Sequence, residues 1–215
     1  MSGQNLFTIE KNTLTWRKFK IFIYVSMLVV FTVTGCDRLQ LPQLQQLAPL
    51  PAEPPCRIAI LPFANESSQE KINYIVYKIF LAEFLRVSQL EVVQEGDIKK
   101  LYRQLRIFPG QQPNFDQIKI IANRLDSQLI ITGVIIDAQE SFSGTTPNPS
   151  LTFSLQIIDA PTGRTIWNTY HKRNGQHYQK ILHFGVIASL SGLARKMSQE
   201  IIDLWIREGL MPCLD

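Results

Sequence analysis

One cysteine stands where its thiol could carry a lipid. Cys36 closes the stretch Val33-Thr34-Gly35-Cys36, in which a small residue directly precedes the cysteine. This is the pattern of a bacterial lipobox, where a peptidase accepts the small residue and the thiol carries a diacylglycerol. The motif therefore predicts signal cleavage between Gly35 and Cys36 and lipidation of Cys36.

The residues before Cys36 have the three parts of a secretory signal. The stretch 17–20 is basic, residues 21–34 form an uncharged apolar run, and a small residue follows. Signal peptides have an apolar region of about 7–15 residues, whereas a membrane-spanning helix needs about 20, and Arg38 ends this run early. We predict a signal peptide over residues 1–35. An uncleaved membrane anchor is the alternative, and both place the rest of the chain outside the cytoplasm.

The other two cysteines form an even pair. Cys56 opens the predicted globular part and Cys213 nearly ends it. Disulfides persist in oxidising compartments such as the periplasm. A Cys56–Cys213 disulfide that joins the two ends of the domain is one prediction, and two free thiols are the alternative.

No motif in the sequence indicates catalysis, a cofactor or a metal site. Gly163 stands alone in the turn APTGRT and not in a phosphate-binding glycine loop. CxxC, HExxH and GxSxG patterns do not occur. His171, His177 and His183 are spaced by six, which metal sites rarely use on one element. We therefore predict a protein that is not an enzyme and binds no cofactor and no metal.

The basic character of the chain belongs mostly to the predicted signal. The chain has a formal net charge of +4 and a pI near 9.0. Residues 1–35 hold four basic side chains and one acidic side chain, which leaves 18 basic and 17 acidic side chains in the rest. A nearly neutral mature part gives no argument for nucleic-acid binding.

Residues 36–55 are predicted to be the lipidated cysteine and a tether. The stretch 37–55 reads DRLQLPQLQQLAPLPAEPP and holds five of the twelve prolines. Proline fixes φ and removes a backbone donor, so we expect neither helix nor sheet here but a semi-extended spacer. Its leucines could rest on lipid or on a partner, and the sequence does not choose between the two.

Residues 56–215 are predicted to form one mixed α/β domain. Hydrophobic periods and turn residues give the order β-α-β-α-α-β-β-β-α, with about five strands in one sheet and helices packed on it in two or three layers. The strands are expected at 57–63, 90–93, 128–138, 151–159 and 164–172, and the helices at 69–87, 98–105, 114–125 and 186–208. Parallel pairing is expected at the start and a meander at the end.

Apolar side chains at three-and-four spacing predict the buried side of each long helix. In the first helix they are Ile72, Ile75, Val76, Ile79, Ala82 and Leu85, and in the last Leu190, Leu193, Ala194, Met197, Ile201, Leu204 and Trp205. In the strand at 151–159 the apolar face is Leu151, Phe153, Leu155 and Ile157. Asp97 is predicted to cap the second helix.

Four segments in a fixed order carry a family resemblance. They read RIAILPFANESS, LEVVQEGDIKKLYRQL, IIANRLDSQLIITGVI and LQIIDAPTGRTIW. Over residues 57–206 the chain resembles a family of bacterial envelope lipoproteins. This family includes the CsgG-like curli-secretion lipoproteins, the LpoB-type activators of penicillin-binding proteins and the amino-terminal domain of TolB. The resemblance implies a periplasmic α/β scaffold that works by binding other proteins.

Two departures limit what the resemblance implies. The third segment has Leu125-Asp126-Ser127-Gln128 where the family more often has Gly-Ala-Asp. The curli channel is built from long inserted hairpins, whereas residues 140–149 form a connection of ten mostly polar residues. The resemblance therefore implies the scaffold and not the secretion channel.

Two features are candidates for a partner surface. The second helix carries the basic residues Lys99, Lys100, Arg103 and Arg106. They form either a solvated face or a patch for an acidic partner. Phe142 is an exposed aromatic residue in the 140–149 hairpin, and Tyr74 and Tyr77 lie either at the edge of the core or in a partner contact.

These observations favour a lipid-anchored protein of the bacterial envelope that faces the periplasm. We expect a non-enzymatic adaptor or assembly factor, for transport assembly or for regulation of a cell-wall synthase. The alternative is a ring-forming homo-oligomeric component of a curli-type secretion apparatus. The partners are then the membrane, through the lipid anchor, and an envelope protein, with no nucleic acid. Whether the inner or the outer membrane holds the anchor stays open.

Overall fold

Strands from distant parts of the sequence form one mixed sheet. The computed structural model of the protein describes residues 41–87, 90–180 and 184–211. Within these ranges the sheet has seven strands, in the order β1-β9-β8-β5-β2-β4, with β3 paired to β5. The strands are β1 (Gln43–Gln46), β2 (Arg57–Ile60), β3 (Ala64–Asn65), β4 (Glu91–Val92), β5 (Leu129–Gln139), β8 (Ser150–Asp159) and β9 (Thr165–Asn174). The predicted mixed α/β class is confirmed, and β1 and β3 are strands that the sequence did not indicate.

The pairing within the sheet follows the predicted topology. β2 pairs in parallel with β4 and with β5, and residues 58–61 are fully buried, as expected for a strand covered on both faces. β5, β8 and β9 form the antiparallel meander. The four predicted apolar residues of β8, from Leu151 to Ile157, are fully buried.

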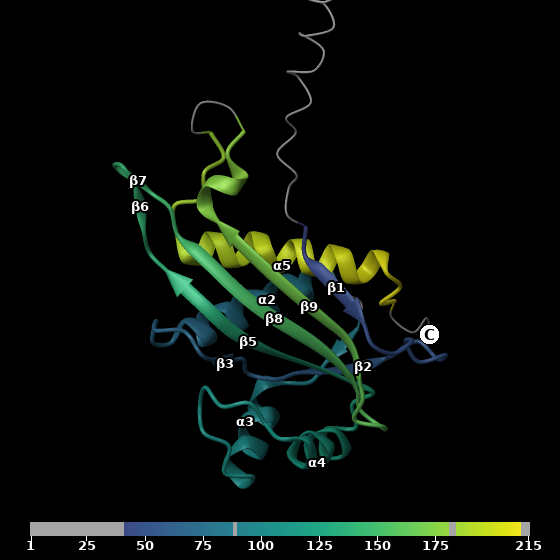
Figure 1. Ribbon diagram of the computed structural model, residues 1–215. Coiled ribbons are helices and arrows are strands. Elements are labelled where there is room, and N and C mark those ends of the chain that lie inside the picture. The colour runs from purple at the N-terminus through teal and green to yellow at the C-terminus, as the bar shows by residue number, and fades with distance from the viewer. Residues whose placement is uncertain (1–40, 88–89, 181–183, 212–215) are drawn as a thin grey trace, which may run out of the picture. The chain divides into compact units, whose positions relative to one another are not determined.

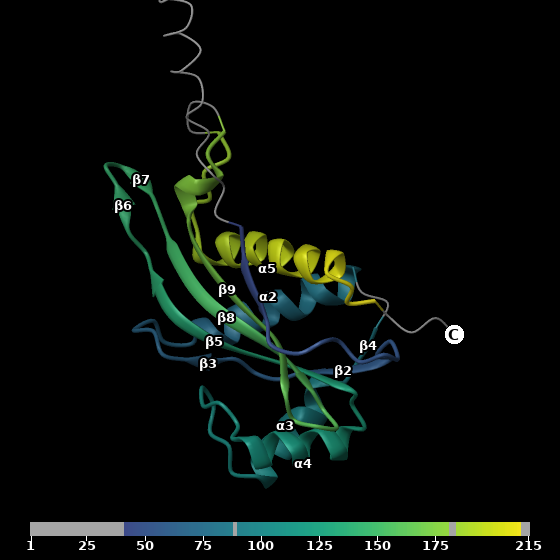
Figure 2. The ribbon, with the colours of Figure 1, turned by 45° about the vertical axis from the view of Figure 1, so that its right-hand side comes forward.

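Four α-helices of the described chain cover the two faces of the sheet. They are α2 (Ile72–Val87), α3 (Glu95–Gln104), α4 (Phe115–Leu125) and α5 (Leu190–Arg207), and a short 3-10 helix, η1 (Gly175–Tyr178), follows β9. In Figure 1 α2 and α5 run side by side along one face, while α3 and α4 lie below the strands. Figure 2 shows the two helix pairs on opposite sides of the sheet. One apolar core lies under α2 and α5, and a second lies under α3 and α4.

The ends of the helices follow local capping. Asn114 and Gln117 form a capping box at the start of α4, and the Ser189 side chain accepts a hydrogen bond from the Gly192 amide at the start of α5. The predicted cap at Asp97 is wrong, because α3 begins two residues earlier at Glu95 and its N-cap, Gln94, makes no side-chain capping bond. Two carboxylates in the first turn of α3 favour this start through the helix dipole.

The buried side of α2 agrees with the prediction in part: Ile72 and Val76 are buried and Ile79 is half-buried. Ile75 and Leu85 are 42% and 54% exposed, and Ala82 is exposed as well. The rings that fill the core instead belong to Tyr77, Phe80 and Phe84. α2 is apolar on nearly every side, so residue spacing alone does not identify the side that faces the sheet. In α5, by contrast, the predicted stripe is buried except for Leu204, which is half-buried.

The expectation of a spacer without sheet structure is wrong for Gln43–Gln46. This segment is β1, an edge strand that pairs antiparallel with residues 167–170 of β9. The amides of Leu47 and Ala48 also donate to the carbonyl of Ile166. The prolines flank the strand and do not interrupt it, and Leu44 and Leu50 pack against the core under α2 and α5. Part of the predicted tether thus contacts the domain.

Several predictions concern residues that the structure does not describe. The signal peptide at 1–35, the lipidated Cys36, His183 and Cys213 all lie outside the described ranges. In the described part, no helix combines the length and apolarity needed to cross a membrane. The 140–149 connection is the predicted hairpin, built from β6 (Phe142–Ser143) and β7 (Thr146–Pro147).

Candidate functional site

α2 presents an apolar surface to solvent, which we define as the outer face of α2: Tyr74, Ile75, Ala82 and Leu85. Tyr74 and Leu85 are each 54% exposed. Two charged side chains also lie on this side of α2: Lys78, whose side chain is 38% exposed and whose ammonium lies 5.6 Å from the centre of the Tyr74 ring, and the exposed Arg86. At a rise of about 1.5 Å per residue the outer face extends over roughly 16 Å. Isolated exposed apolar residues are ordinary, whereas several exposed apolar side chains along one helix are typical of a protein contact.

A pocket lies at one end of the outer face of α2, beyond the carboxyl ends of β2 and β4. Its volume is about 530 Å³, within the usual range for ligand pockets. We call it the aromatic pocket because three tyrosines and a phenylalanine are among the residues that line it: Pro62, Phe63, Asn73, Tyr74, Tyr77, Glu95, Lys99, Tyr102, Arg103, Ile107, Pro109 and Gly110. Ligands of parallel α/β sheets commonly bind at this end of the strands.

Glu95 is held between two ammonium groups at the side of the aromatic pocket. It pairs with Lys78 and with Lys99, whose Nζ lies 2.9 Å from Glu95 Oε1. Burial raises the pKa of Glu95, but the hydrogen bonds from the two lysines outweigh burial and hold it below its usual value. The same hydrogen bond raises the pKa of Lys99. The Glu95 carboxylate is therefore ionised at neutral pH, and its negative charge is balanced by the two lysines.

Two buried tyrosines of the aromatic pocket have different hydrogen bonding. The Tyr77 hydroxyl donates to the Ile60 carbonyl at 3.3 Å, whereas the Tyr102 hydroxyl has no partner among the described residues. Burial raises the pKa of both. Tyr77 is 2% exposed and belongs to the core, while the exposed Tyr74 is the one available to a partner.

The five residues proposed as a partner surface do not form one patch. Lys99 and Arg103 line the aromatic pocket. Lys100, on the same helix, lines a separate polar hollow with Arg57 and Arg124. Arg106 follows the end of α3 with a positive φ of 54°. Phe142 is 71% exposed on the β6–β7 hairpin, which lies apart from α3 in both ribbon views (Figure 1).

A buried ionic group that the sequence did not indicate connects β9 with α5. We call it the β9–α5 cluster: His171, Arg173, Tyr178 and Glu200. Glu200 Oε2 lies 2.6 Å from His171 Nε2, accepts from the Tyr178 hydroxyl at 3.0 Å and lies 3.4 Å from Arg173 Nε. The Arg173 guanidinium also lies over the Tyr178 ring, 5.3 Å from its centre.

The protonation states in the β9–α5 cluster follow from burial and hydrogen bonding. Burial lowers the pKa of His171 below its usual value, and the nearby Arg173 adds to this, although Glu200 opposes it. Burial raises the pKa of Glu200, but hydrogen bonding to His171 and the charge of Arg173 outweigh it and keep the pKa low. His171 is therefore neutral and Glu200 charged at neutral pH. Every group has a partner, so the cluster is a structural link.

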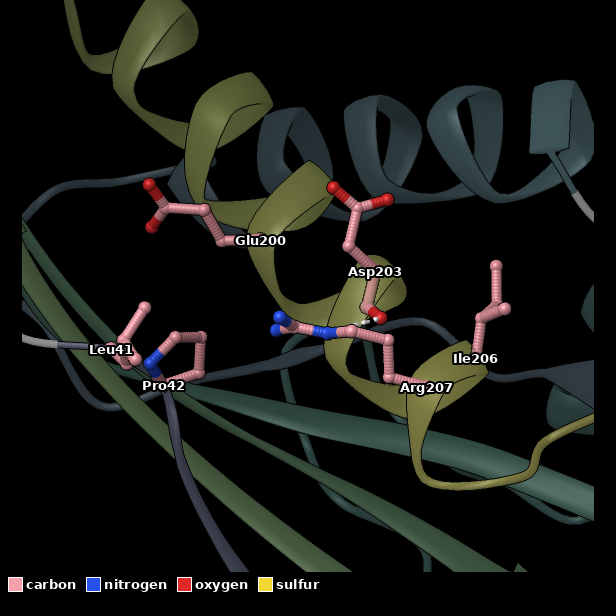
Figure 3. Close-up of a pocket in the computed structure, with 6 residues that line it drawn as sticks. All are labelled: Leu41, Pro42, Glu200, Asp203, Ile206 and Arg207. Carbon is pink, nitrogen blue, oxygen red and sulfur yellow. Dashed lines mark hydrogen bonds between the residues drawn. The ribbon is translucent and has the colours of Figure 1, made fainter.

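A shallow hollow of about 410 Å³ lies on the solvent side of this cluster. It lies between the start of β1 and the last turns of α5 (Figure 3). In that view the Arg207 side chain extends from α5 toward Pro42, and its Nε donates to the Asp203 carbonyl at 3.3 Å. Leu41, 63% exposed, lies at the opposite side. The hollow brings the end of the predicted tether against α5.

The remaining candidate groups have local roles or lie outside the described ranges. His177 and Asn174 form a capping box at η1, so His171 and His177 belong to different structural units. Cys56 is exposed at the start of β2, and since Cys213 is not described, the Cys56–Cys213 disulfide stays a prediction. No group of metal-ligating side chains occurs within the described residues.

The chain matches no known family model and no curated protein. It is similar to solved structures, among them lipoprotein GNA1162 from Neisseria meningitidis, with a TM-score of 0.51 and 12% identity over 71% of this chain and 99% of that chain. A PelC variant dodecamer from Paraburkholderia phytofirmans has a TM-score of 0.50 and 12% identity, over 75% and 95% of the two chains. The C-terminal domain of LpoB from Salmonella enterica has a TM-score of 0.46 and 11% identity, over 56% and 84%. The first two likenesses show that this chain has the fold of lipoprotein GNA1162 and PelC, so the α/β scaffold expected from the resemblance is confirmed as a fold.

Proposed function

We propose that this protein is a lipid-anchored lipoprotein of the bacterial envelope that acts without catalysis, as an adaptor or assembly factor for an envelope complex. Its anchor is the lipid on Cys36, and it faces the periplasm. The lipobox at residues 33–36 and the shared fold with lipoprotein GNA1162 support the anchor and the location.

The outer face of α2 is the observation that carries the adaptor role. Large apolar side chains of a helix normally face the core, yet Tyr74, Ile75 and Leu85 are 42–54% exposed. The apolar and aromatic side chains of this face match the centre of protein interfaces, and the one ammonium beside Tyr74, that of Lys78, is already paired with Glu95. We infer that the partner covers the outer face of α2 in the cell, for transport assembly or for regulation of a cell-wall synthase.

A ring-forming oligomer is the second candidate function. The fold is shared with a PelC variant that is a dodecamer, and the outer face of α2 is equally suited to a second copy of this chain. In this version the protein is an oligomeric component of a secretion apparatus of the curli type. The native mass of the full-length protein, extracted from membranes, separates the two: a monomer contradicts the ring, and a large symmetric oligomer contradicts the simple adaptor.

Crosslinking in the native cell tests the adaptor role. We expect Ile75→Glu to abolish the crosslinked product, because a carboxylate in the centre of an apolar contact loses its hydration. Ile120→Glu, on α4, is the matched control, since Ile120 is 41% exposed against 42% for Ile75. Retention of the product in both variants, or its loss in both, contradicts the assignment of the contact to α2.

The lipid anchor needs its own test. We expect Cys36→Ser to accumulate as a precursor that keeps residues 1–35, because the serine hydroxyl cannot form the thioether. The mass of the protein from the membrane fraction checks this. A wild-type protein whose mass corresponds to the unmodified chain contradicts lipidation.

A further inference from the structure

We propose that the aromatic pocket binds a small organic anion, an apolar and preferably aromatic molecule that carries one carboxylate. This site lies beside the outer face of α2 and is independent of the adaptor role. The charge at its opening, the unpartnered donors within it and its apolar walls together favour this class of ligand.

The walls of the aromatic pocket are apolar rings already held in place. Phe63, Tyr77 and Tyr102 are 1%, 2% and 7% exposed. The Phe63 and Tyr77 rings meet edge to face, with their centres 5.6 Å apart. A flat apolar group that enters the pocket therefore meets packed ring surfaces that need no rearrangement, which favours binding because little ordering is lost.

The charges at the opening of the aromatic pocket favour an anion. Glu95, the only carboxylate that lines it, is already paired with Lys78 and Lys99. Arg103 lines the same pocket, and its guanidinium makes no ion pair with any described residue. The net charge along the lining is thus positive, and Arg103 has a planar donor pair that fits a carboxylate.

A second donor in the lining is unused. The Tyr102 hydroxyl is buried without a hydrogen-bond partner among the described residues. Leaving a buried donor unpaired is unfavourable, and such groups in native proteins commonly mark a ligand site. Tyr102 and Arg103 both line the aromatic pocket, so the pocket holds two donors for an anionic group.

Calorimetric titration of the full-length lipidated protein in nanodiscs, with empty nanodiscs as the blank, tests this site. The probes are 2-naphthoate and 2-naphthamide, which have the same ring system and nearly the same size but differ in charge. We expect 2-naphthoate to bind one molecule per chain, about tenfold more tightly than 2-naphthamide, since a charge-assisted hydrogen bond accounts for a difference of this order.

Variants of α3 separate a built site from general attraction. We expect Arg103→Gln to weaken 2-naphthoate about tenfold and to leave 2-naphthamide within about twofold, and Tyr102→Phe to weaken 2-naphthoate by a smaller factor. Lys100→Gln removes the same charge from the same helix but outside the pocket, and we expect no change.

Three results would overturn the proposal. The first is equal binding of the two probes, or no binding of either, to the wild type. The second is an equal loss of 2-naphthoate in Lys100→Gln and Arg103→Gln, which would indicate attraction to a basic helix only. The third is a loss of 2-naphthoate binding in Ile75→Glu without such a loss in Arg103→Gln, which would place the probe on the outer face of α2. The adaptor role is tested by the crosslinked product and is unaffected by any of these.

Discussion

α2 and α5 pack side by side on the same face of the sheet, but they expose different kinds of side chain to solvent. The exposed side of α5 carries Ser191, Arg195, Lys196, Asp203 and Arg207, with Ile206 as its only large apolar residue. The exposed side of α2 is mostly apolar, with Arg86 and the partly exposed Lys78 as its charges over residues 72–86. Two helices in one layer thus differ: α5 is amphipathic, and α2 has apolar side chains on both its buried and its exposed side. The difference indicates that α5 needs no further contact, whereas the exposed side of α2 is suited to contact with another molecule.

Both helices are fixed to the sheet by polar bonds and by packing, so the difference between them lies on the solvent side. α5 is fixed by specific polar bonds: Trp205 Nε1 donates to Thr169 Oγ1 at 2.7 Å, and Glu200 enters the β9–α5 cluster. α2 is fixed by rings, with Phe80 5.6 Å from Phe63 and 5.8 Å from Trp205, and also by polar bonds, from the Asn73 side chain to the Phe63 carbonyl at 2.9 Å and from the Tyr77 hydroxyl to the Ile60 carbonyl at 3.3 Å. Polar bonds select one orientation of a helix about its axis, so the exposed side of α2 is set by the fold and is not a result of loose packing.

The largest effect is expected at the buried stripe of α5. Leu193 is fully buried, and Leu193→Asp would place a carboxylate in the core between α5 and the sheet. We expect the free energy of unfolding to fall by about 3–5 kcal/mol, measured by urea denaturation. Lys196→Asp, on the exposed side of the same helix, should change it by about 0.5 kcal/mol or less. An unchanged midpoint in Leu193→Asp contradicts the packing of α5.

The next effect is expected in the β9–α5 cluster. Glu200→Gln keeps the size of the side chain but removes the negative charge beside Arg173, which is 2% exposed. Because a buried guanidinium then lacks its anion, we expect a loss of about 3 kcal/mol. Asp203→Asn is the matched control, since Asp203 lies one turn later on the rim of the same hollow (Figure 3). Equal midpoints for the two variants would mean that the cluster contributes little.

The same cluster makes the stability depend on pH. The folded-state pKa of His171 lies below 6.5, so as the pH falls below 6.5 the unfolded chain binds a proton that the folded chain does not, and stability decreases. The pKa of Glu200 lies below 4.5, so its contribution is lost below 4.5 in the same direction. We expect His171→Gln to reduce the slope of the unfolding free energy against pH near pH 6 and to leave the slope below pH 4.5 unchanged. Identical slopes near pH 6 would contradict a neutral His171.

The sequence predicted the elements whose pattern is local and could not predict those that depend on the partner element. The alternation of β8 and the stripe of α5 each follow from neighbouring residues, and both are confirmed, except that Leu204 of α5 is half-buried. The strand β1 was not predicted because Gln43–Gln46 lacks β-forming residues, and this segment is a strand only through its pairing with β9. The stripe of α2 was right for Ile72, Val76 and Ile79 and wrong for Ile75, Ala82 and Leu85, because a helix with apolar residues on several sides has no single preferred side.

The candidate sites were less accessible to sequence reasoning than the fold. The aromatic pocket joins Phe63 from the loop between β2 and β3, Tyr77 from α2 and Tyr102 from α3, and nothing in their spacing connects them. The β9–α5 cluster joins His171 and Arg173 to Glu200. The sequence held one signal. Residues 167, 169, 171 and 173 share one face of β9, so His171 and Arg173 lie on the same buried face as Trp167 and require a buried polar partner.

A smaller effect is expected where the two helices meet. Glu83 of α2 accepts from Gln199 at 3.1 Å and pairs with Arg86 at 2.7 Å and with Arg195 at 3.4 Å. Both arginine side chains are more than 60% exposed, so solvent weakens these pairs. We expect Glu83→Gln to lower the free energy of unfolding by about 1 kcal/mol or less, with a weaker dependence on salt. A loss as large as that in Glu200→Gln would contradict the distinction between the two helices.

The smallest effect on stability is expected on the outer face of α2, and it is the most informative. Ile75→Glu should change the free energy of unfolding by about 0.5 kcal/mol or less, because a charged side chain at a 42% exposed position stays hydrated. Val76→Glu, one residue later, should lower it by several kcal/mol, since Val76 is fully buried. If Ile75→Glu unfolds the domain, the outer face of α2 belongs to the core of this chain and needs no partner. If it leaves stability unchanged while the crosslinked product disappears, the apolar surface of α2 serves binding, because the domain folds equally well without it.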